Sequence, residues 1–236
     1  METKTIYIVG NATFENYTEA RDYEKYLKEK EFNELLENNN LNCKIDLDKF
    51  NDYQLEEIKL GLKQNLDVSI YASPKFSAVQ MSVIRESLEK GLDIKQYINS
   101  KFYIGQMRLI IEGLEAGLDV SIYAKNYFDY KSMNEIKLGL KNRLNISIYA
   151  RPEFNYDQMR EIRFGLEKGL NVLVYAKTEF SHLQMQEIRL GIEHKVDISV
   201  YTRVEVDYQK MRKYRLALEK GEDASTVEFD FDQMFT

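Results

Sequence analysis

The chain is poor in the residues from which disulfide cores, thiolate metal sites and catalytic centres are built. Its 236 residues include one cysteine, two histidines, two prolines and no tryptophan. The single cysteine, Cys43, excludes an internal disulfide and a thiolate metal cage, and it suits a reducing cytosol. No apolar run approaches the 18 residues that span a bilayer, and the opening METKTIYIVGN lacks the apolar core of a signal peptide. We therefore expect a cytoplasmic protein with no membrane partner.

What the chain does contain is enough for a folded core. Hydrophobic residues make up 44% of the sequence, so disorder is not expected. Its 33 basic and 39 acidic side chains give a net charge of −6. This balance favours solubility and disfavours nonspecific binding to nucleic acid.

The strongest signal is an internal repeat of 26 residues. The marker positions are Leu55, Met81, Met107, Met133, Met159, Met185 and Met211. A fixed period of this size is typical of stacked helical repeats. One copy offers about eight apolar side chains, too few to offset the entropy of ordering its backbone, so the copies are expected to stack.

Each copy carries the signals of a helix start and stop. In the copy around Met159, Asn155 is the expected N-cap, Gln158 completes a capping box, and Phe154 precedes the cap as a hydrophobic staple. A glycine such as Gly169 ends the long helix in the left-handed conformation. Arg143 and Lys195 replace that glycine in two copies, where we expect less regular ends. A second, short helix of the type VSIYA follows after a new Asp or Asn cap.

The N-terminus differs from the repeats. Thr3–Val9 and Ala12–Phe14 read as strands around a Gly10-Asn11 turn, and Thr18 is the expected cap of the helix that follows. The sequence thus predicts a mostly α protein, an α-solenoid of about seven repeats. A small ββα unit (1–38) precedes the solenoid (39–236). The solenoid begins with a degenerate half repeat (41–50), has full repeats from residue 50, and ends in a truncated repeat (229–236).

Most recurring columns have a packing explanation. Met159, Ile162 and Leu166 share one helical face and belong to the expected core. A glycine six residues after the marker permits close packing. The tyrosines of the short helices are expected in the core with hydrogen-bonded hydroxyl groups, and a ligand-stacking ladder is the alternative. They are Tyr71, Tyr97, Tyr123, Tyr149, Tyr175 and Tyr201.

A helical wheel leaves basic residues pointing outward on the long helices. We call these residues the basic ribbon: Lys59, Arg85, Arg108, Lys137, Arg160, Arg163, Arg189, Arg212 and Arg215. Arg163 and Arg189 each have a glutamate four residues later, so a solvated ion-pair lattice explains the pattern. The alternative is a surface for an acidic protein or a phosphate backbone.

The second and third repeats deviate together. Apolar residues replace the usual polar ones, which suggests an apolar patch for a partner protein, a second copy or the N-terminal unit. A rotated packing of these two helices explains the deviation equally well. The candidate patch consists of Val79, Val83, Tyr103, Ile104, Leu109 and Ile111. A homo-oligomer through this 79–111 patch or through the N-terminal strands is a further option.

Catalytic signals are weak. His182 and His194 have no paired carboxylate or cysteine in the sequence pattern, and no glycine loop that would cradle a phosphate is present. We therefore predict a chain that is not an enzyme and has no catalytic, cofactor-binding or metal-binding residues.

The repeat resembles one from known proteins. The blocks QMREIRFGLEKGLNVLVYA (158–176) and QMRLIIEGLEAGLDVSIYA (106–124) are similar to a short helical repeat of largely uncharacterised phage and mobile-element proteins from gut-dwelling Gram-positive bacteria. The resemblance implies an accessory protein that disarms a host defence system, of the anti-CRISPR or anti-restriction type, by binding it in the host cytosol. The partner would be a host or phage protein. A nucleic-acid-binding repeat protein that uses the basic ribbon is the alternative.

Overall fold

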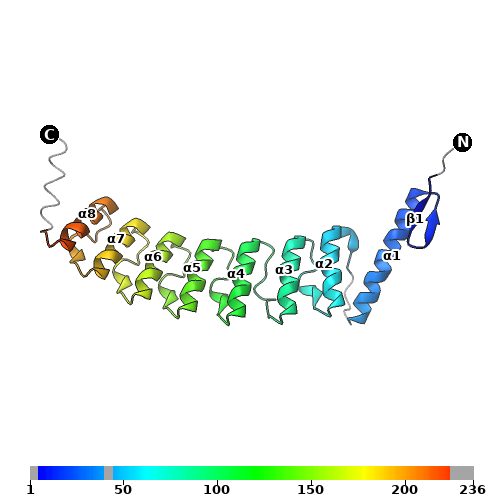
Figure 1. The fold of residues 1–236 in the computed structure, drawn as a ribbon, viewed down its shortest axis with the longest axis horizontal. Helices are drawn as coiled ribbons and strands as arrows, with labels where there is room; N and C mark the ends of the chain where they lie inside the picture. Colours follow the sequence, from blue (N-terminus) through cyan, green and yellow to red (C-terminus); the bar gives the residue numbers. More distant parts are fainter. Residues whose placement is uncertain (1–4, 40–44, 224–236) are drawn as a thin grey trace. The chain divides into compact units, whose positions relative to one another are not determined.

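The structure of the protein is a computed structural model, and it describes residues 5–39 and 45–223. These residues form eight α-helices, six short 3-10 helices and one two-stranded sheet (Figure 1). The chain divides into two compact units, Met1–Ile104 and Gly105–Thr236. The prediction of a mostly helical chain with two N-terminal strands is confirmed.

Unit 1 begins with a β-hairpin that packs on a long helix. Strands β1 (Tyr7–Val9) and β2 (Ala12–Phe14) are antiparallel, with Ile8 opposite Thr13. Helix α1 (Tyr17–Asn38) is capped by Asn16, whose side chain accepts a hydrogen bond from the Thr18 N–H. The cap is therefore two residues earlier than predicted, because the Asn16 backbone is already extended and leaves Thr18 inside the first turn.

The repeats of unit 1 follow α1. They comprise η1 (Leu47–Lys49), α2 (Asp52–Lys63), η2 (Val68–Ile70) and α3 (Ala78–Glu89). Asn39 ties α1 to α2, because its side-chain amide donates to the carbonyl oxygens of Leu35 and Leu62 at 2.7 and 2.9 Å. An ion pair between Lys59 and Glu31, at 2.6 Å, joins the same two helices.

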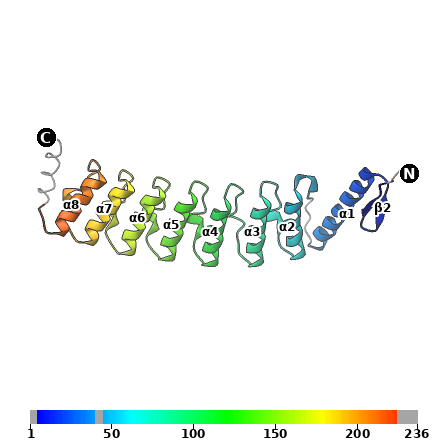
Figure 2. The same cartoon turned by 45° about the horizontal axis from the view of Figure 1, so that its top comes forward.

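Unit 2 contains the most regular repeats. Its helices are α4 (Ile104–Glu115, of which Ile104 belongs to unit 1), α5 (Tyr130–Lys141), α6 (Tyr156–Glu167), α7 (His182–Glu193) and α8 (Tyr208–Glu219). The 3-10 helices between them are η3 (Val120–Ile122), η4 (Ile146–Ile148), η5 (Val172–Val174) and η6 (Ile198–Val200). Figures 1 and 2 both show α5 to α8 side by side in chain order, each packed against the next.

The predicted helix starts are confirmed in detail. Full capping boxes open α2, α3, α6 and α7. In each box the glutamine also reaches the following repeat. In α6, for example, the Gln158 side-chain carbonyl accepts from the Asn155 N–H, while its amide donates to the Phe180 carbonyl at 2.7 Å. One side chain thus holds its own helix start and the next repeat together.

The helix ends are more uniform than predicted. Gly91, Gly117, Gly169 and Gly221 have positive φ. Arg143 and Lys195 adopt the same left-handed conformation, with φ of 55° and 61°. The expectation of less regular ends at these two residues is therefore wrong: the N–H groups of Leu144 and Val196 donate to the carbonyl oxygens of Gly139 and Gly191, the same backbone hydrogen bond that closes the glycine ends.

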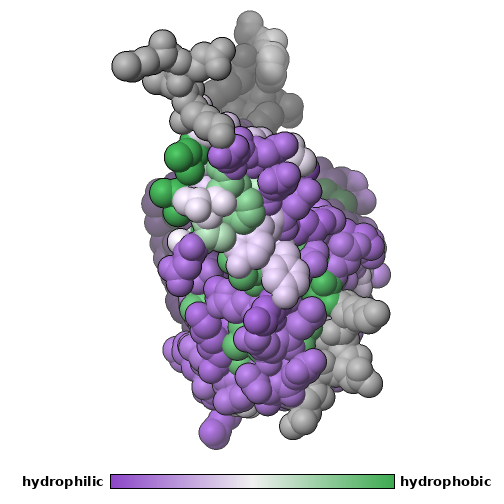
Figure 3. Space-filling model, turned by 90° about the vertical axis from the view of Figure 1, so that its right-hand side faces the viewer, coloured by the Kyte–Doolittle hydropathy of each residue, from purple (hydrophilic) through white to green (hydrophobic). Residues whose placement is uncertain are grey.

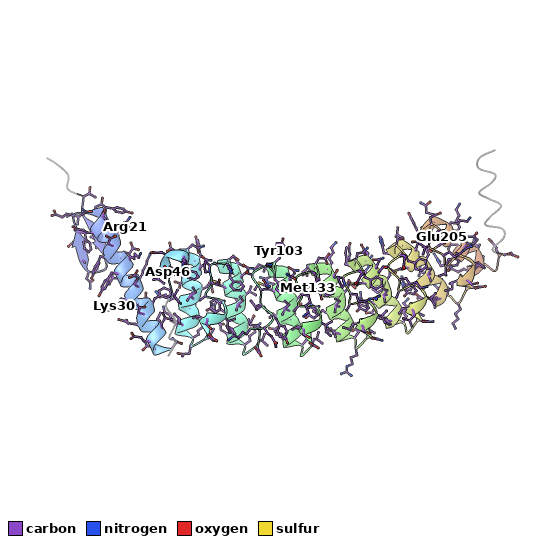
Figure 4. All side chains as sticks on the ribbon, turned by 180° about the vertical axis from the view of Figure 1, so that it is seen from behind. Arg21, Lys30, Asp46, Tyr103, Met133 and Glu205 are labelled. Atoms are coloured by element: carbon purple, nitrogen blue, oxygen red, sulfur yellow. The ribbon has the colours of Figure 1, made fainter. Side chains whose placement is uncertain are left out.

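The core follows the 26-residue period. The six marker methionines are fully buried, and Leu55 is half-buried. Figure 4 shows Met133 within the helices of unit 2. Five tyrosines, Tyr71, Tyr123, Tyr149, Tyr175 and Tyr201, are fully buried, and each donates its hydroxyl proton to a backbone carbonyl of the preceding long helix. The core assignment of these tyrosines is confirmed.

The glycine six residues after the marker and the tyrosine of the short helix that follows it are coupled, because the tyrosine hydroxyl group lies where a side chain on the glycine would be. A Cβ at Gly165 would lie 2.0 Å from the Tyr175 hydroxyl oxygen, and four other glycines have the same relationship. The α3 repeat carries Ser87 instead of glycine, and its Tyr97 is only half-buried. No 3-10 helix follows α3 in the described residues. The expected short helix is otherwise present, as a single 3-10 turn.

Two predicted features fall outside the description. The truncated repeat at 229–236 lies outside the described residues, as do residues 41–44 of the predicted half repeat at 41–50, which include Cys43. The later residues of that half repeat include η1.

Candidate interaction surface

Only two of the nine residues of the basic ribbon, Arg108 and Arg212, are exposed, and the other seven are buried or half-buried. Arg163, Arg189 and Arg215 are buried, each with 7% of its surface exposed, and Arg85 is half-buried. The wheel was wrong for these residues because an arginine side chain is long enough to turn from its own helix onto the preceding one.

Each of the four arginines meets a glutamate of the preceding long helix, 28 residues earlier. The Nε–Oε2 distances are 2.7 Å for Arg163–Glu135, 2.9 Å for Arg189–Glu161 and 2.7 Å for Arg215–Glu187 in unit 2. Arg85–Glu57, at 2.8 Å, is the equivalent pair in unit 1. A second carboxylate, four residues later on the same helix, completes the set in every case.

The electrostatics agree with a structural role. Burial by itself would lower the pKa of Arg163, but its hydrogen bonds to Glu135 and Glu167 raise that pKa above the ordinary value. The second carboxylates of α7 and α8, Glu193 and Glu219, have lowered pKa values. The hydrogen bond from Lys168 lowers the pKa of Glu193. Burial would raise the pKa of Glu219, but His194 and Arg215 lower it. These charges are balanced inside the protein.

The rest of the basic ribbon is divided. Lys59 pairs with Glu31, Lys137 with Glu112, and Arg160 with Asp157. Arg108 and Arg212 are exposed and make no ion pair among the described residues. The ion-pair lattice is therefore present. Its most buried members join successive repeats, which a wheel of one helix does not reveal.

The predicted apolar patch is also divided. Val83, Leu109 and Ile111 are buried, with 8%, 2% and 8% of their surfaces exposed, so the structure contradicts their place on an exposed patch. Val83 and Leu109 stand two residues after the marker, where four other copies have the glutamate of an ion pair, and Ile111 stands four after it, where the other copies have arginine or lysine. Ile104 is half-buried. Val79 and Tyr103 are exposed, at 58% and 81%.

Exposed aromatic residues gather instead near the N-terminal ends of long helices. In unit 1, Tyr53 is 79% exposed on the first turn of α2, and Tyr103 immediately precedes α4. Figure 4 shows Tyr103 near the upper edge of the ribbon in that view. In unit 2, Tyr127 and Tyr130 flank the start of α5 and are both more than half exposed. We missed Tyr53, Tyr127 and Tyr130 in the sequence because they do not share one repeat position.

A groove runs between α2 and α3 in unit 1. Its volume is about 460 Å³, and its lining includes Tyr53, Glu56, Ala78, Val79 and Ser82. A second hollow lies between α1, η1 and α2, but its walls are held together by the ion pairs Lys25–Asp48 and Lys28–Asp52. The α2–α3 groove is the more apolar of the two.

The hairpin end of unit 1 has a small apolar area. Figure 3 faces this end and shows pale and green residues within a mostly hydrophilic surface. Ile6 and Ile8 are exposed there, as are Tyr17 and Tyr26 of α1. Homo-oligomer formation through these strands stays a prediction.

One expectation about the histidines is wrong. His194 does have a carboxylate partner, because its Nδ1 lies 2.6 Å from Oε1 of Glu219. Residues of the preceding repeats make the same kind of contact across 25 residues, in Asn142–Glu167 and Lys168–Glu193. The histidine therefore belongs to a row of polar links between helices. Over residues 5–39 and 45–223, no group of three or more His, Cys, Asp or Glu residues could hold a metal ion.

Comparisons with known proteins add no relative. No protein-family model, curated protein or solved structure matches the chain. Among the helices that the structure describes, none combines the length and apolar character needed to cross a bilayer.

Proposed function

We propose that this chain is a non-enzymatic protein-binding repeat protein whose 26-residue copies form an α-solenoid. The observation that carries the proposal is the exposure of Tyr53, Tyr103, Tyr127 and Tyr130 beside long helices whose other large apolar residues are mostly buried. Tyrosine is enriched at protein interfaces, since it supplies a large contact area and a hydroxyl group at little entropic cost.

The arrangement of charge favours a protein over a nucleic acid as the partner. A phosphate backbone is bound by exposed lysines and arginines. Here Arg163, Arg189 and Arg215 are already neutralised by glutamates within unit 2. Arg108 and Arg212 remain for the nucleic-acid alternative. The resemblance to mobile-element repeats adds a class of target to the proposal, namely a host defence protein such as a CRISPR or restriction nuclease.

Affinity capture with three forms of the tagged full chain tests the proposal. The forms are wild type, a quadruple variant in which Tyr53, Tyr103, Tyr127 and Tyr130 are replaced by serine, and the control Arg108→Ser/Arg212→Ser. Mass spectrometry after capture from host lysate, with and without nuclease, gives the readout. We expect a nuclease-resistant protein that binds wild type and the arginine control but not the tyrosine variant.

The same experiment can contradict the proposal. Capture that needs nucleic acid, is lost with Arg108→Ser/Arg212→Ser and falls steeply between 50 and 200 mM salt would support the nucleic-acid alternative. Circular dichroism of each variant is the control for folding.

A further inference from the structure

We infer that the α2–α3 groove of unit 1 binds a partner segment that presents an apolar side chain next to a lysine or arginine. The inference rests on the proposed function and names the chemistry of the partner at one site. Its basis is the combination of an open apolar hollow with an acidic rim, which the corresponding residues of unit 2 do not reproduce.

The hollow exists because of one small residue. Ala78 stands three residues before the marker methionine of α3. At the same position the copies of unit 2 carry Tyr130, Tyr156, His182 and Tyr208. Ala78 leaves the space between Tyr53 and Val79 open, and all three residues line the groove.

The walls of the groove are apolar and exposed. Tyr53 and Val79 both stand two residues before the marker of their helix, so they occupy the same position on successive helices. They are 79% and 58% exposed. The same position in unit 2 holds Gly105, Lys131, Asp157, Leu183 and Gln209. An aliphatic or aromatic side chain of a partner can pack between Tyr53 and Val79, whereas the mostly polar residues at this position in unit 2 offer less apolar contact.

The charge at the groove is acidic. Glu56 is exposed and makes no ion pair within the described residues. Asp52 is exposed next to Tyr53 and forms an ion pair with Lys28 at 3.8 Å. Glu57 also lines the groove, but it is paired with Arg85. Glu56 stands one residue after the marker of α2, and the same position holds Arg160 in α6 and Arg212 in α8. A basic residue on the partner therefore meets an unpaired carboxylate at this groove.

A random dodecapeptide library displayed on phage, selected against the immobilised full chain, tests this chemistry. We expect enriched peptides in which an apolar residue lies within four positions of a lysine or arginine. The best peptide, made synthetically with a fluorescein label, is then titrated by fluorescence polarisation. Ala78→Tyr should weaken binding at least tenfold by filling the groove, and it should fold because tyrosine occupies this position in α5, α6 and α8.

Matched variants separate the groove from the rest of the chain. Val79→Asp and Glu56→Lys should each weaken binding at least tenfold. Leu183→Asp and Gln186→Lys place the same changes at the same repeat positions of α7 and should change the affinity less than twofold.

Several results would overturn the inference. They are the absence of enriched peptides, enrichment without basic residues, and equal binding by Ala78→Tyr and wild type. Self-association of the chain that is lost with Val79→Asp would show that a second copy occupies the groove instead. If the peptides depend on Tyr127 and Tyr130 rather than on the groove, this inference fails while protein binding stands. Loss of all tyrosine-dependent capture from lysate is the separate failure of the proposed function.

Discussion

Nε of Arg163 on α6 lies 2.7 Å from Oε2 of Glu135 on α5, and both side chains are almost completely buried. A buried charge that loses its partner is costly, whereas an apolar pair in the same space is not.

We predict that Glu135→Gln lowers the free energy of unfolding by about 3–5 kcal/mol, because it leaves the Arg163 guanidinium without its buried counter-ion. The double variant Glu135→Leu/Arg163→Ile should recover most of that loss. Leu109 and Ile111 stand at these two repeat positions in α4, so the apolar residues suit the helix. Urea unfolding followed by circular dichroism measures wild type, Glu135→Gln, the double variant and the two single variants Glu135→Leu and Arg163→Ile. Additive effects of Glu135→Leu and Arg163→Ile would contradict the coupling.

Gly165→Ala should destabilise unit 2 by about 1–3 kcal/mol, the usual cost of forcing an extra methyl group into a packed site. The new Cβ would lie 2.0 Å from the Tyr175 hydroxyl oxygen and 2.7 Å from a Val172 methyl carbon. Adding Tyr175→Phe removes the nearer atom and should recover part of the loss. Thermal unfolding gives the comparison, and unchanged stability of Gly165→Ala would show that the tyrosine moves aside freely.

Arg143→Gly and Lys195→Gly should each stabilise the protein by about 1 kcal/mol, because glycine adopts positive φ without the steric cost that a Cβ imposes. The reciprocal change Gly169→Lys is the control and should destabilise by a similar amount. Calorimetric melting temperatures are the measurement. A fall in melting temperature for both glycine variants would mean that the arginine and lysine side chains make contacts worth more than the backbone strain.

Stability should fall in acid. The pKa values of Glu193 and Glu219 lie below the ordinary 4.5 in the folded protein. Their ionised forms therefore add stability that is complete above about pH 4.5 and is lost as the pH falls through the folded values. We expect urea midpoints to be level between pH 7 and 5 and to drop below pH 4.5.

Glu219→Gln is the test variant for this dependence. It should be less stable than wild type at pH 7 but should lose less between pH 5 and 3. An equal loss in both proteins would mean that other carboxylates carry the acid sensitivity. Exposed Glu153 supplies the matched control as Glu153→Gln, which should follow the wild-type curve.

Local signals in the sequence predicted most of the helices. A capping residue such as Asn155, its Gln158 partner and a closing glycine act within one helix, so a single copy contains all the information. The buried methionines follow from the same periodicity. Asn16 shows where this reasoning was less exact: Thr18 was the predicted cap, but the backbone is still extended at Asn16, two residues earlier, and Asn16 caps the helix.

Contacts between helices were the part that the wheel did not predict. On a wheel of α6 alone, Arg163 lies on the face opposite the core residues. Only the position of α5 shows that the Arg163 side chain meets Glu135. A signal was present, since Glu57, Glu135, Glu161 and Glu187 are each followed by an arginine 28 residues later. The α2–α3 groove had no such signal, because it arises from the small size of Ala78 beside two unrelated exposed residues.

The glutamine at each capping box has a consequence for the history of the gene. Three polar links between α6 and α7 join repeat positions that are also joined between α7 and α8: Gln158 to the backbone at Phe180, Glu161 to Arg189, and Lys168 to Glu193. If recombination adds or removes a whole 26-residue copy here, each of these residues still has a partner at the corresponding position of the adjacent copy. A shift of one or two codons breaks them all at once. These links are therefore compatible with the gain or loss of complete 26-residue copies, but not with insertions or deletions of one or two residues.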